Sequence, residues 1–276
     1  MKIAAIQMRS GLDPEANLAA LEPMLAEAAA AGAGYVLTPE VTMLFPENRA
    51  QLASVAAPFE GHPQLQLVGE LAGQHGIYIH IGSLAVPLPD GRFANRSVLF
   101  GPDGAMIAFY DKIHLFDATI AGLDAYRESA TYAGGEAAVI APLRDFTLGM
   151  SICYDMRFPS LFHALAKAGA DLLAVPAAFT VPTGEAHWHV LLRARAIETG
   201  SYVIAAAQGG RHPNGRATYG HSLVIDPWGR IVAELDHDAP GVLVAEIFPE
   251  QVAEARQRIP ALANTRDFAQ PLPLQR

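Results

Sequence analysis

The chain begins with Lys2-Ile-Ala-Ala-Ile-Gln-Met8, continues through an Ala- and Leu-rich run over residues 13–31, and then reads Tyr35-Val-Leu-Thr38. The first and last of these segments are short and apolar, which is typical of strands buried on both faces. Asp13 and Pro14 open the central run as an N-cap and a first-turn proline, and Gly32 ends it, so the run predicts a helix. Pro23 lies inside the run and argues against one continuous helix. A strand, a helix and a second strand predict a layered α/β fold.

The same alternation continues to the end of the chain. Helices are predicted at residues 63–74, 159–168, 185–198 and after Pro249, and strands at residues 77–81, 92–100, 105–110, 147–152, 171–175, 202–206, 222–225, 231–234 and 242–246. This order predicts helices that cover sheets, in an α/β or α+β arrangement. The length predicts one domain over residues 1–276. A C-terminal tail from about residue 260, containing Pro271 and Pro273, is expected on the surface or against a partner subunit.

The composition indicates a globular protein outside the membrane. Hydrophobic residues make up 51% of the chain and charged residues 17%, which is typical of a protein with a large buried core. The net charge of −9 gives no basic face, so we expect no nucleic-acid partner. The longest apolar run, residues 172–179, contains Pro176 and is too short to cross a membrane. The first residues do not read as a signal peptide, so a cytoplasmic protein is predicted.

The chain contains one cysteine, Cys153, which excludes an internal disulfide and a thiolate zinc cage. Cys153 follows the predicted strand 147–152 and precedes a predicted helix that starts at Pro159. A helix N-terminus and backbone N–H groups are expected there to lower the pKa of the thiol and to supply donors for an oxyanion. The position alone is equally compatible with a small buried hydrophobic residue.

Glu40 and Lys112 also follow predicted strands, and ligands of open α/β sheets bind beyond the carboxyl ends of strands. Partial burial of Glu40 after Pro39 is expected to raise the pKa of its carboxyl group toward the range of a general base. Lys112 offers a cation for an oxyanion. Each of these residues taken alone is better explained as a solvated surface side chain. Together with Cys153 they supply a base, a cation and a nucleophile.

Histidines offer a rival arrangement, because a cysteine paired with a histidine is the commoner thiol-hydrolase site. The candidates are His114, His163, His187, His189 and His221. None of them follows a predicted strand as directly as Glu40 does. His187-Trp-His189 has the spacing of two metal ligands on a strand, but it falls at a predicted helix start and has no third ligand beside it, so no metal is predicted. The chain contains no glycine-rich phosphate loop, and no cofactor is expected.

Three segments resemble the catalytic blocks of nitrilase-superfamily hydrolases. They are Leu37-Thr-Pro-Glu40, Tyr110-Asp-Lys-Ile-His-Leu-Phe116 and Gly149-Met-Ser-Ile-Cys-Tyr-Asp-Met-Arg-Phe158, and the similarity continues through residues 184–188, 193–198 and 219–229. The resemblance therefore covers nearly the whole chain. It implies an α-β-β-α sandwich, a triad of Glu40, Lys112 and Cys153, and a homodimer. It also implies a second glutamate, which Tyr126-Arg-Glu-Ser129 assigns to Glu128.

The resemblance also implies the chemistry of these residues. Glu40 takes the thiol proton as Cys153 attacks an amide carbonyl, and Lys112 with the Tyr154 backbone N–H stabilises the oxyanion. The resulting thioester is hydrolysed by water that Glu40 activates. Glu128 is expected to orient Lys112 and the leaving amine.

Within the superfamily the chain is most similar to the Nit branch, and residues 191–199 and 205–208 resemble deaminated glutathione amidases. Such enzymes release 2-oxoglutarate and Cys-Gly from a small carboxylated amide. Arg157 is then expected to bind the α-keto acid carboxylate, Thr183 to add a hydroxyl donor, and Phe179 to wall the pocket. Two alternatives remain open: an ω-amidase acting on α-ketoglutaramate, which needs the same carboxylate contact, and a catalytically silent scaffold of the same fold.

Overall fold

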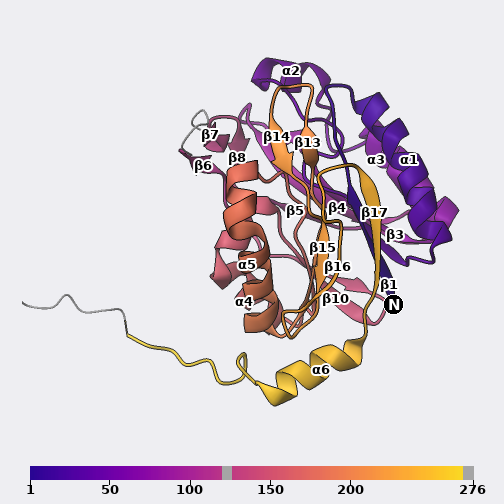
Figure 1. Ribbon diagram of the computed structural model, residues 1–276. Helices are drawn as coiled ribbons and strands as arrows, with labels where there is room; N and C mark the ends of the chain where they lie inside the picture. The colour runs from indigo at the N-terminus through magenta and orange to yellow at the C-terminus, as the bar shows by residue number, and fades with distance from the viewer. Residues whose placement is uncertain (120–125, 270–276) are drawn as a thin grey trace, which may run out of the picture.

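The computed structural model describes residues 1–119 and 126–269. Two mixed sheets form the centre of this part of the chain (Figure 1). The strands of the first sheet are, in spatial order, β17 (Gly241–Glu246), β1 (Lys2–Gln7), β2 (Tyr35–Leu37), β3 (Tyr78–Pro87), β4 (Phe93–Phe100) and β5 (Met106–Asp111), with β8 (Tyr132–Ala133) paired to β4. Those of the second are β16 (Ile231–Glu234), β15 (Leu223–Ile225), β12 (Tyr202–Ala205), β11 (Leu172–Ala174), β10 (Phe146–Met150) and β9 (Ile140–Leu143).

Helices cover the outer face of each sheet. α1 (Pro14–Ala30) and α3 (Pro63–His75) pack on the first sheet, whereas α4 (Pro159–Lys167) and α5 (Val181–Thr199) pack on the second (Figure 1). α6 (Pro249–Arg258) follows the last strand. The layers therefore run helix, sheet, sheet, helix, which confirms the predicted α-β-β-α sandwich.

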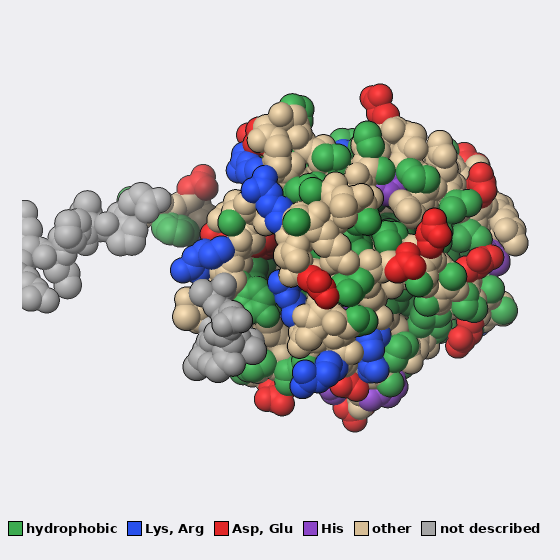
Figure 2. All heavy atoms as spheres, turned by 90° about the horizontal axis from the view of Figure 1, so that it is seen from above, with side chains coloured by type: hydrophobic (Ala, Val, Ile, Leu, Met, Phe, Trp, Pro, Cys, Tyr) green, Lys and Arg blue, Asp and Glu red, His purple; other side chains and the backbone are tan. Residues whose placement is uncertain are grey.

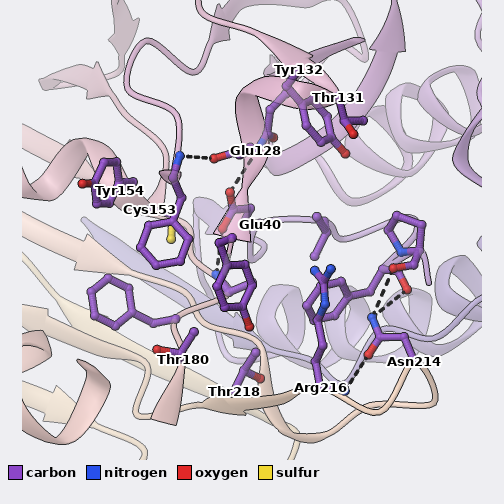
Figure 3. A pocket seen from close by; sticks show the side chains of 18 of the residues that line it. Glu40, Glu128, Thr131, Tyr132, Cys153, Tyr154, Thr180, Asn214, Arg216 and Thr218 are labelled. Atoms are coloured by element: carbon purple, nitrogen blue, oxygen red, sulfur yellow. Dashed lines mark hydrogen bonds between the residues drawn. The ribbon is translucent and has the colours of Figure 1, made fainter. Parts of the chain in front are cut away.

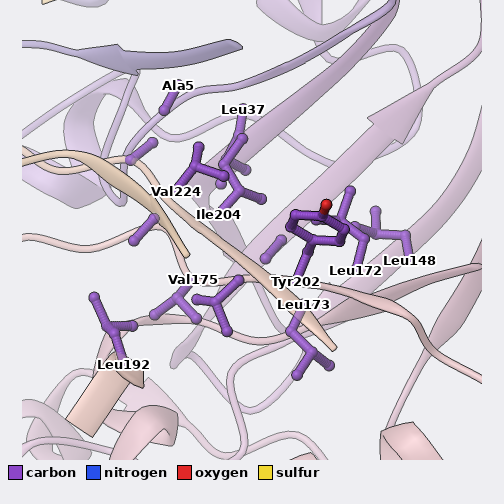
Figure 4. Close-up of a cluster of buried hydrophobic side chains, with 14 of the residues drawn as sticks. Ala5, Leu37, Leu148, Leu172, Leu173, Val175, Leu192, Tyr202, Ile204 and Val224 are labelled. Atoms are coloured by element: carbon purple, nitrogen blue, oxygen red, sulfur yellow. The ribbon is translucent and has the colours of Figure 1, made fainter. Parts of the chain in front are cut away.

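The apolar character of β1 reflects burial on both faces of its sheet. Ala4 and Ile6 pack with side chains of α1 and α3. Ile3 and Ala5 point the other way and join the layer between the two sheets, part of which is shown in Figure 4. Burial of one isoleucine side chain contributes roughly 1.5–3 kcal/mol. Both faces of the strand therefore stabilise the sandwich, which explains why the strand reads as a continuous apolar run.

α1 differs from its prediction because it runs through Pro23 without a break. Asp13 caps the helix as predicted, since its side chain accepts the Glu15 backbone N–H at 3.0 Å. Pro23 is exposed, so the carbonyl that loses its intrahelical donor can be hydrated. Leu21 and Leu25 are fully buried on either side of the proline. Their packing holds the helix together across the missing hydrogen bond.

Several short elements were not predicted. They are α2 (Arg49–Val55), β6 (Asp117–Ala118), β7 (Tyr126–Arg127), β8, β9, β13 (Gly209–Arg211), β14 (Ala217–Tyr219) and the short 3-10 helices η1 (Glu128–Ala130) and η2 (Cys153–Arg157). They are too short to show an apolar period. Figure 1 shows α2, β6, β7, β13 and β14 at the end of the sandwich opposite the N-terminus. The parallel strands β1, β2 and β3 point their carboxyl ends toward this end, where a ligand site is expected.

The C-terminal tail lies on the surface over the part that the structure describes. Residues 261–269 are exposed except for Leu262, which is half-buried. Pro271 and Pro273 lie outside the described residues, and contact with a partner subunit stays a prediction. Within residues 1–119 and 126–269, no helix is both long and apolar enough to cross a membrane.

Candidate active site

Three strand ends bring Glu40, Lys112 and Cys153 together, and Figure 3 shows Glu40 and Cys153 in the same pocket. Lys112 Nζ lies 2.8 Å from Glu40 Oε1. Cys153 lines the same cavity as this carboxylate, and each of the two groups shifts the pKa of the other. All three residues are buried. The residues that the strand ends singled out are therefore neighbours around one carboxylate.

Glu128 lies on the other side of Lys112. Its oxygens Oε1 and Oε2 are 3.0 and 2.9 Å from Lys112 Nζ, and Oε2 also accepts the Phe116 backbone N–H at 2.6 Å. Asn95 donates to Glu40 Oε1 at 3.0 Å and to Glu128 Oε1 at 3.2 Å. The ammonium is thus held between two carboxylates that Asn95 bridges. Asn95 was missed because it lies inside β4, where no strand end marks it.

The expectation of a raised pKa at Glu40 is wrong. Burial does oppose ionisation of this carboxyl group, but the ammonium of Lys112 and hydrogen bonds from Lys112, Cys153 and the Ala178 backbone N–H outweigh it. The Ala178 N–H lies 2.9 Å from Glu40 Oε2. Together they hold the pKa of Glu40 below its ordinary value. The carboxylate is therefore ionised at neutral pH and can accept a proton.

Lys112 keeps its charge although only 2% of the residue is exposed. Burial opposes the charge, but the carboxylates of Glu128 and Glu40 raise the pKa of Lys112 well above its ordinary value. A permanent ammonium beside the thiol can stabilise negative charge on a reacting oxygen.

The pKa of Cys153 also departs from the prediction. Burial and the negative charge of Glu40 raise the pKa of the thiol well above its ordinary value, and the Lys112 charge does not reverse this. The expected helix N-terminus is not at the cysteine, because Cys153 opens η2 and α4 begins only at Pro159. The thiol is therefore neutral at rest, beside an ionised carboxylate that can accept its proton.

The backbone at Cys153 is held in the left-handed region, with φ of 47°. Its N–H donates to the Pro176 carbonyl at 2.8 Å. A residue other than glycine rarely adopts this conformation, and such strain is common at active sites. Among the hydrogen bonds of the described residues, the Tyr154 backbone N–H has no acceptor. That N–H is available for the predicted oxyanion, and its role stays a prediction.

Asp155 fixes the cysteine turn to the end of β5. The residue is fully buried, and its Oδ2 accepts the Tyr110 hydroxyl at 2.7 Å and the Ile152 N–H at 2.8 Å. Its Oδ1 accepts the His114 backbone N–H at 3.0 Å and lies 2.7 Å from His114 Nδ1. Sequence reasoning missed this role, although Asp155 stands two residues after the cysteine in the third block.

A cavity of about 810 Å³ opens above the catalytic candidates. Tyr154, Arg157, Phe179 and Thr183 all line it, as predicted for substrate-binding residues. The Arg157 guanidinium carbon lies 5.2 Å from the ring centroid of Phe179 and 5.8 Å from that of Tyr154. Thr183 Oγ1 lies 2.8 Å from Thr180 Oγ1. Their contacts with a substrate stay predictions.

Further arginines of the described chain line the same cavity, namely Arg49, Arg127, Arg211 and Arg216. They come from α2, β7, β13 and the turn between β13 and β14. Seen from above, this face of the molecule carries a row of Lys and Arg side chains (Figure 2). Guanidinium groups bind carboxylates through paired hydrogen bonds, so the wall favours an anionic ligand. Sequence reasoning missed these residues because they lie on segments far apart in the chain.

The Cys-His arrangement finds no support at the pocket. Among the residues that the structure describes, no histidine lines the cavity. His187 lies at its margin, where Nδ1 is 3.3 Å from the Arg157 guanidinium nitrogens. His114 Nδ1 is occupied by Asp155. The candidate base beside Cys153 is therefore the Glu40 carboxylate.

Comparison with known proteins agrees with this geometry. A family model described as carbon-nitrogen hydrolase matches residues 2–257. The chain is 41% identical to the deaminated glutathione amidase of Yersinia enterocolitica, over 96% of this chain and 92% of that protein. It is 37% identical to the NitFhit protein of C. elegans, with a TM-score of 0.89. The match covers 96% of this chain and 65% of that longer chain. Saccharomyces cerevisiae Nit3, a member of branch 10 of the nitrilase superfamily, is 31% identical with a TM-score of 0.85 over 94% of both chains. The chain therefore belongs to the carbon-nitrogen hydrolase family of the nitrilase superfamily.

Proposed function

We propose that the protein is an amidase that hydrolyses deaminated glutathione to 2-oxoglutarate and Cys-Gly through a thioester on Cys153. One observation carries this proposal: the buried cluster of Glu40, Lys112 and Cys153 forms the floor of a cavity whose wall bears arginines. The identity of 41% to a protein named for this substrate supports the choice.

The first half of the reaction forms the thioester. Ionised Glu40 accepts the thiol proton while the Cys153 sulfur attacks the amide carbon. The carbonyl oxygen becomes an oxyanion stabilised by Lys112 Nζ and the Tyr154 N–H, and one such donor is commonly worth about 10² to 10³ in rate. Protonated Glu40 then gives its proton to the leaving amine. The carbon-nitrogen bond breaks and Cys-Gly departs.

The second half of the reaction frees the acid. Glu40 takes a proton from water, the resulting nucleophile attacks the thioester, and the sulfur leaves and regains its proton from Glu40. Glu128 acts as a positioning residue, because its two oxygens hold the Lys112 ammonium on one side while Glu40 holds it on the other. Lys112 thus needs no reorganisation when the oxyanion forms.

The cavity wall supports the longer of the two candidate substrates. Deaminated glutathione has a carboxylate at each end and the scissile amide between them. Arg157 is assigned to the α-keto acid carboxylate, and the arginines of α2, β7 and the β13–β14 hairpin are assigned to the carboxylate of Cys-Gly. α-Ketoglutaramate carries one carboxylate, so it would leave the second group of arginines without a counter-ion.

The experiment measures 2-oxoglutarate release from deaminated glutathione and from α-ketoglutaramate, side by side. Preference for deaminated glutathione, lost in Cys153→Ala, is the expected result. Preference for α-ketoglutaramate would make the protein an ω-amidase. Intact mass after mixing with substrate should show the acyl adduct on the wild-type chain. Absence of both product and adduct would point to a silent scaffold.

We further propose that the protein is a homodimer. α5 exposes Val190 and Ile197, which are 68% and 54% accessible, and Trp228 is 44% accessible. Arg193 of α5 donates to the Gly229 carbonyl at 2.7 Å, which places the loop carrying Trp228 beside this helix. Exposed apolar side chains gathered in this way are typical of interfaces. Sedimentation equilibrium should give twice the chain mass, and Val190→Asp should reduce it.

A cytoplasmic location is proposed with the same mechanism, because the thiol of Cys153 must stay reduced to act as nucleophile. Cell fractionation followed by immunoblotting tests this, and recovery in the soluble cytoplasmic fraction is expected.

A further inference from the structure

Three side chains outside the proposed reaction meet at the edge of the second sheet. His189 lies in α5, His221 precedes β15, and Glu234 ends β16. His189 Nε2 is 2.7 Å from Glu234 Oε1, and His221 Nδ1 is 3.4 Å from the same oxygen. One donor atom from each residue lies within 4.8 Å of the other two. The side chains are 29%, 19% and 21% exposed, so an ion can reach them from solvent.

We propose that His189, His221 and Glu234 form a binding site for a divalent transition-metal cation, best matched by Zn²⁺. Two imidazoles and one carboxylate are a common set of zinc ligands. Bonds of 2.0–2.2 Å in a tetrahedron place ligand atoms about 3.3 Å apart. The two distances to Glu234 Oε1 lie on either side of that value. The three donor atoms already lie within 4.8 Å of one another, so side-chain shifts can bring them to the ligand separation of a tetrahedral cation.

The hydrogen bonding of the cluster also suits a cation. Both imidazoles direct a ring nitrogen at one carboxylate oxygen, Glu234 Oε1. For both contacts to be hydrogen bonds, each of those nitrogens must carry a proton. When a cation binds, these two nitrogens give up their protons. Their lone pairs and the Glu234 carboxylate then coordinate the cation together. Asp236 Oδ1 lies 3.7 Å from His221 Nδ1 on a side chain that is 94% exposed, so it can supply a fourth ligand.

The surrounding residues orient the two rings. Tyr219 stacks on His221 with centroids 4.2 Å apart and planes 21° apart, and it meets the His189 ring nearly edge-on at 6.1 Å. His221 has a φ of 56°, in the left-handed region that Cys153 also occupies. Strain of this kind is kept where a side chain must point in a fixed direction. Outer contacts that fix ligand rings strengthen metal binding.

The sequence predicts no metal at His187-Trp-His189 because no third ligand stands nearby. The structure separates this pair, since His187 turns toward Arg157 and His189 turns toward ligands from later strands. A cation at His189 would tie α5 to β16, the edge strand of the second sheet. The same helix carries Thr183 to the cavity wall. The expected effect of the cation is thus a more stable attachment of α5.

The test uses the full-length Cys153→Ala protein, which removes the thiol as a competing zinc ligand. ZnCl₂ is titrated by calorimetry, and CoCl₂ is titrated with visible absorption as a probe of coordination geometry. We expect one ion per chain with a dissociation constant of about 10 µM or lower. We also expect the strong visible bands of tetrahedral Co²⁺ and a higher melting temperature with Zn²⁺.

Two variants in the same background locate the site. Glu234→Gln and His189→Ala should weaken Zn²⁺ binding by about 100-fold, because each removes a ligand. Glu234→Gln keeps the shape of the side chain, so it serves if His189→Ala folds poorly. His75→Ala, in the last turn of α3, is the matched histidine control and should bind like the parent. No binding below millimolar Zn²⁺, or equal affinity in Glu234→Gln and the parent, would overturn the proposal.

Discussion

The Cys153 thiol and the Glu40 carboxylate depart from their ordinary pKa values in opposite directions. Burial and the Glu40 charge raise the pKa of the thiol. The charge of Lys112 and hydrogen bonds from Lys112, Cys153 and the Ala178 N–H lower the pKa of Glu40 against the effect of burial. The resting pair is therefore a neutral thiol beside a carboxylate. In the proposed mechanism, proton transfer to Glu40 therefore accompanies attack, whereas a site that stores a thiolate needs no such transfer.

Replacing Glu40 by Gln removes the proton acceptor and keeps the shape of the side chain. We expect kcat/KM to fall by about 10² to 10⁴, the usual contribution of a general base. Thioester formation, followed by intact mass, should slow by the same factor. Lys112 keeps Glu128 as a partner, so the melting temperature should change far less than the rate.

Glu47→Gln is the matched control, because Glu47 also lines the cavity but is exposed, and its side chain makes no hydrogen bond to Glu40 or Lys112 among the described residues. It should leave the rate near the wild-type value. A Glu40→Gln enzyme that retains full activity would show that another group takes the thiol proton.

His80 makes stability depend on pH. It is fully buried in β3, with Nδ1 2.7 Å from the Tyr35 hydroxyl and Nε2 in contact with the Ser97 hydroxyl. Burial lowers the pKa of His80 from 6.5 to about 3. As pH falls from 7 to 5, the unfolded chain binds a proton at this site and the folded chain does not. The free energy of unfolding should therefore drop by about 2 kcal/mol through this residue.

Urea unfolding at pH 7 and pH 5 measures this effect in the wild type and in His80→Gln. The variant should lose about 2 kcal/mol less than the wild type over this interval. Other buried histidines are common to both proteins and cancel in the difference. Equal pH dependence in the two proteins would contradict the assignment.

Among the helices and strands, α1 forms although it contains a proline, Pro23, in its interior. Pro23 removes a hydrogen bond from the helix interior, while buried leucines on both sides hold the helix on the first sheet. Tertiary packing thus decides the helix where local propensity opposes it.

Pro23→Ala should stabilise the protein, because it restores the missing N–H at an exposed position of α1. We expect the free energy of unfolding to rise by about 1 to 3 kcal/mol. Pro14→Ala is the control, since the N–H at the first helical position has no partner within the helix and its return adds little. Urea denaturation measures both. A loss of stability in Pro23→Ala would show that the proline ring makes contacts worth more than the hydrogen bond.

At the scale of the whole molecule, the cavity exists because segments far apart in the chain meet at one end of the sandwich. Its arginines come from α2, β7, η2 and the β13–β14 hairpin. The Arg216 guanidinium carbon lies 5.4 Å from the Phe45 ring centroid and 5.6 Å from that of Tyr126, so aromatic side chains from two other segments surround it. The wall is thus an assembled surface that no single segment carries.

Arg216→Gln should raise KM for deaminated glutathione by about 10- to 100-fold, because a charged hydrogen bond to a carboxylate is lost. It should leave kcat nearly unchanged, since Arg216 does not touch the reacting atoms in the proposed mechanism. Arg92→Gln is the control, because Arg92 pairs with Asp90 on the surface and does not line the cavity. Steady-state kinetics measures both variants. A fall in kcat at constant KM would contradict a binding role for Arg216.

The resemblance to nitrilase-superfamily hydrolases and the sandwich fold are confirmed. The catalytic assignments of Glu40, Lys112, Glu128 and Cys153 stay predictions, as does the single domain over residues 1–276, although the four side chains lie together. The alternation of elements and the positions of Glu40, Lys112 and Cys153 after strands were within reach of the sequence, because strands, helix caps and strand ends depend on neighbours along the chain. The sandwich and Glu128 came from the family resemblance. Glu40, Lys112 and Cys153 each follow a strand, and the apolar residues of that strand predict it from the sequence.

Other properties depend on neighbours in space and came only from the tertiary structure. Asn95 bridges two carboxylates from inside a strand, and the arginines gather from distant loops. The pKa directions of Glu40 and Cys153 reversed the expectation, because a buried charge responds to whichever partner lies within a few ångströms. The sequence by itself determined the alternation of strands and helices through local periodicity, and its resemblance to nitrilase-superfamily hydrolases implied the sandwich layers and the candidate catalytic residues. The tertiary structure decided their protonation and the shape of the pocket, because electrostatics and cavities depend on distances that residue order does not encode.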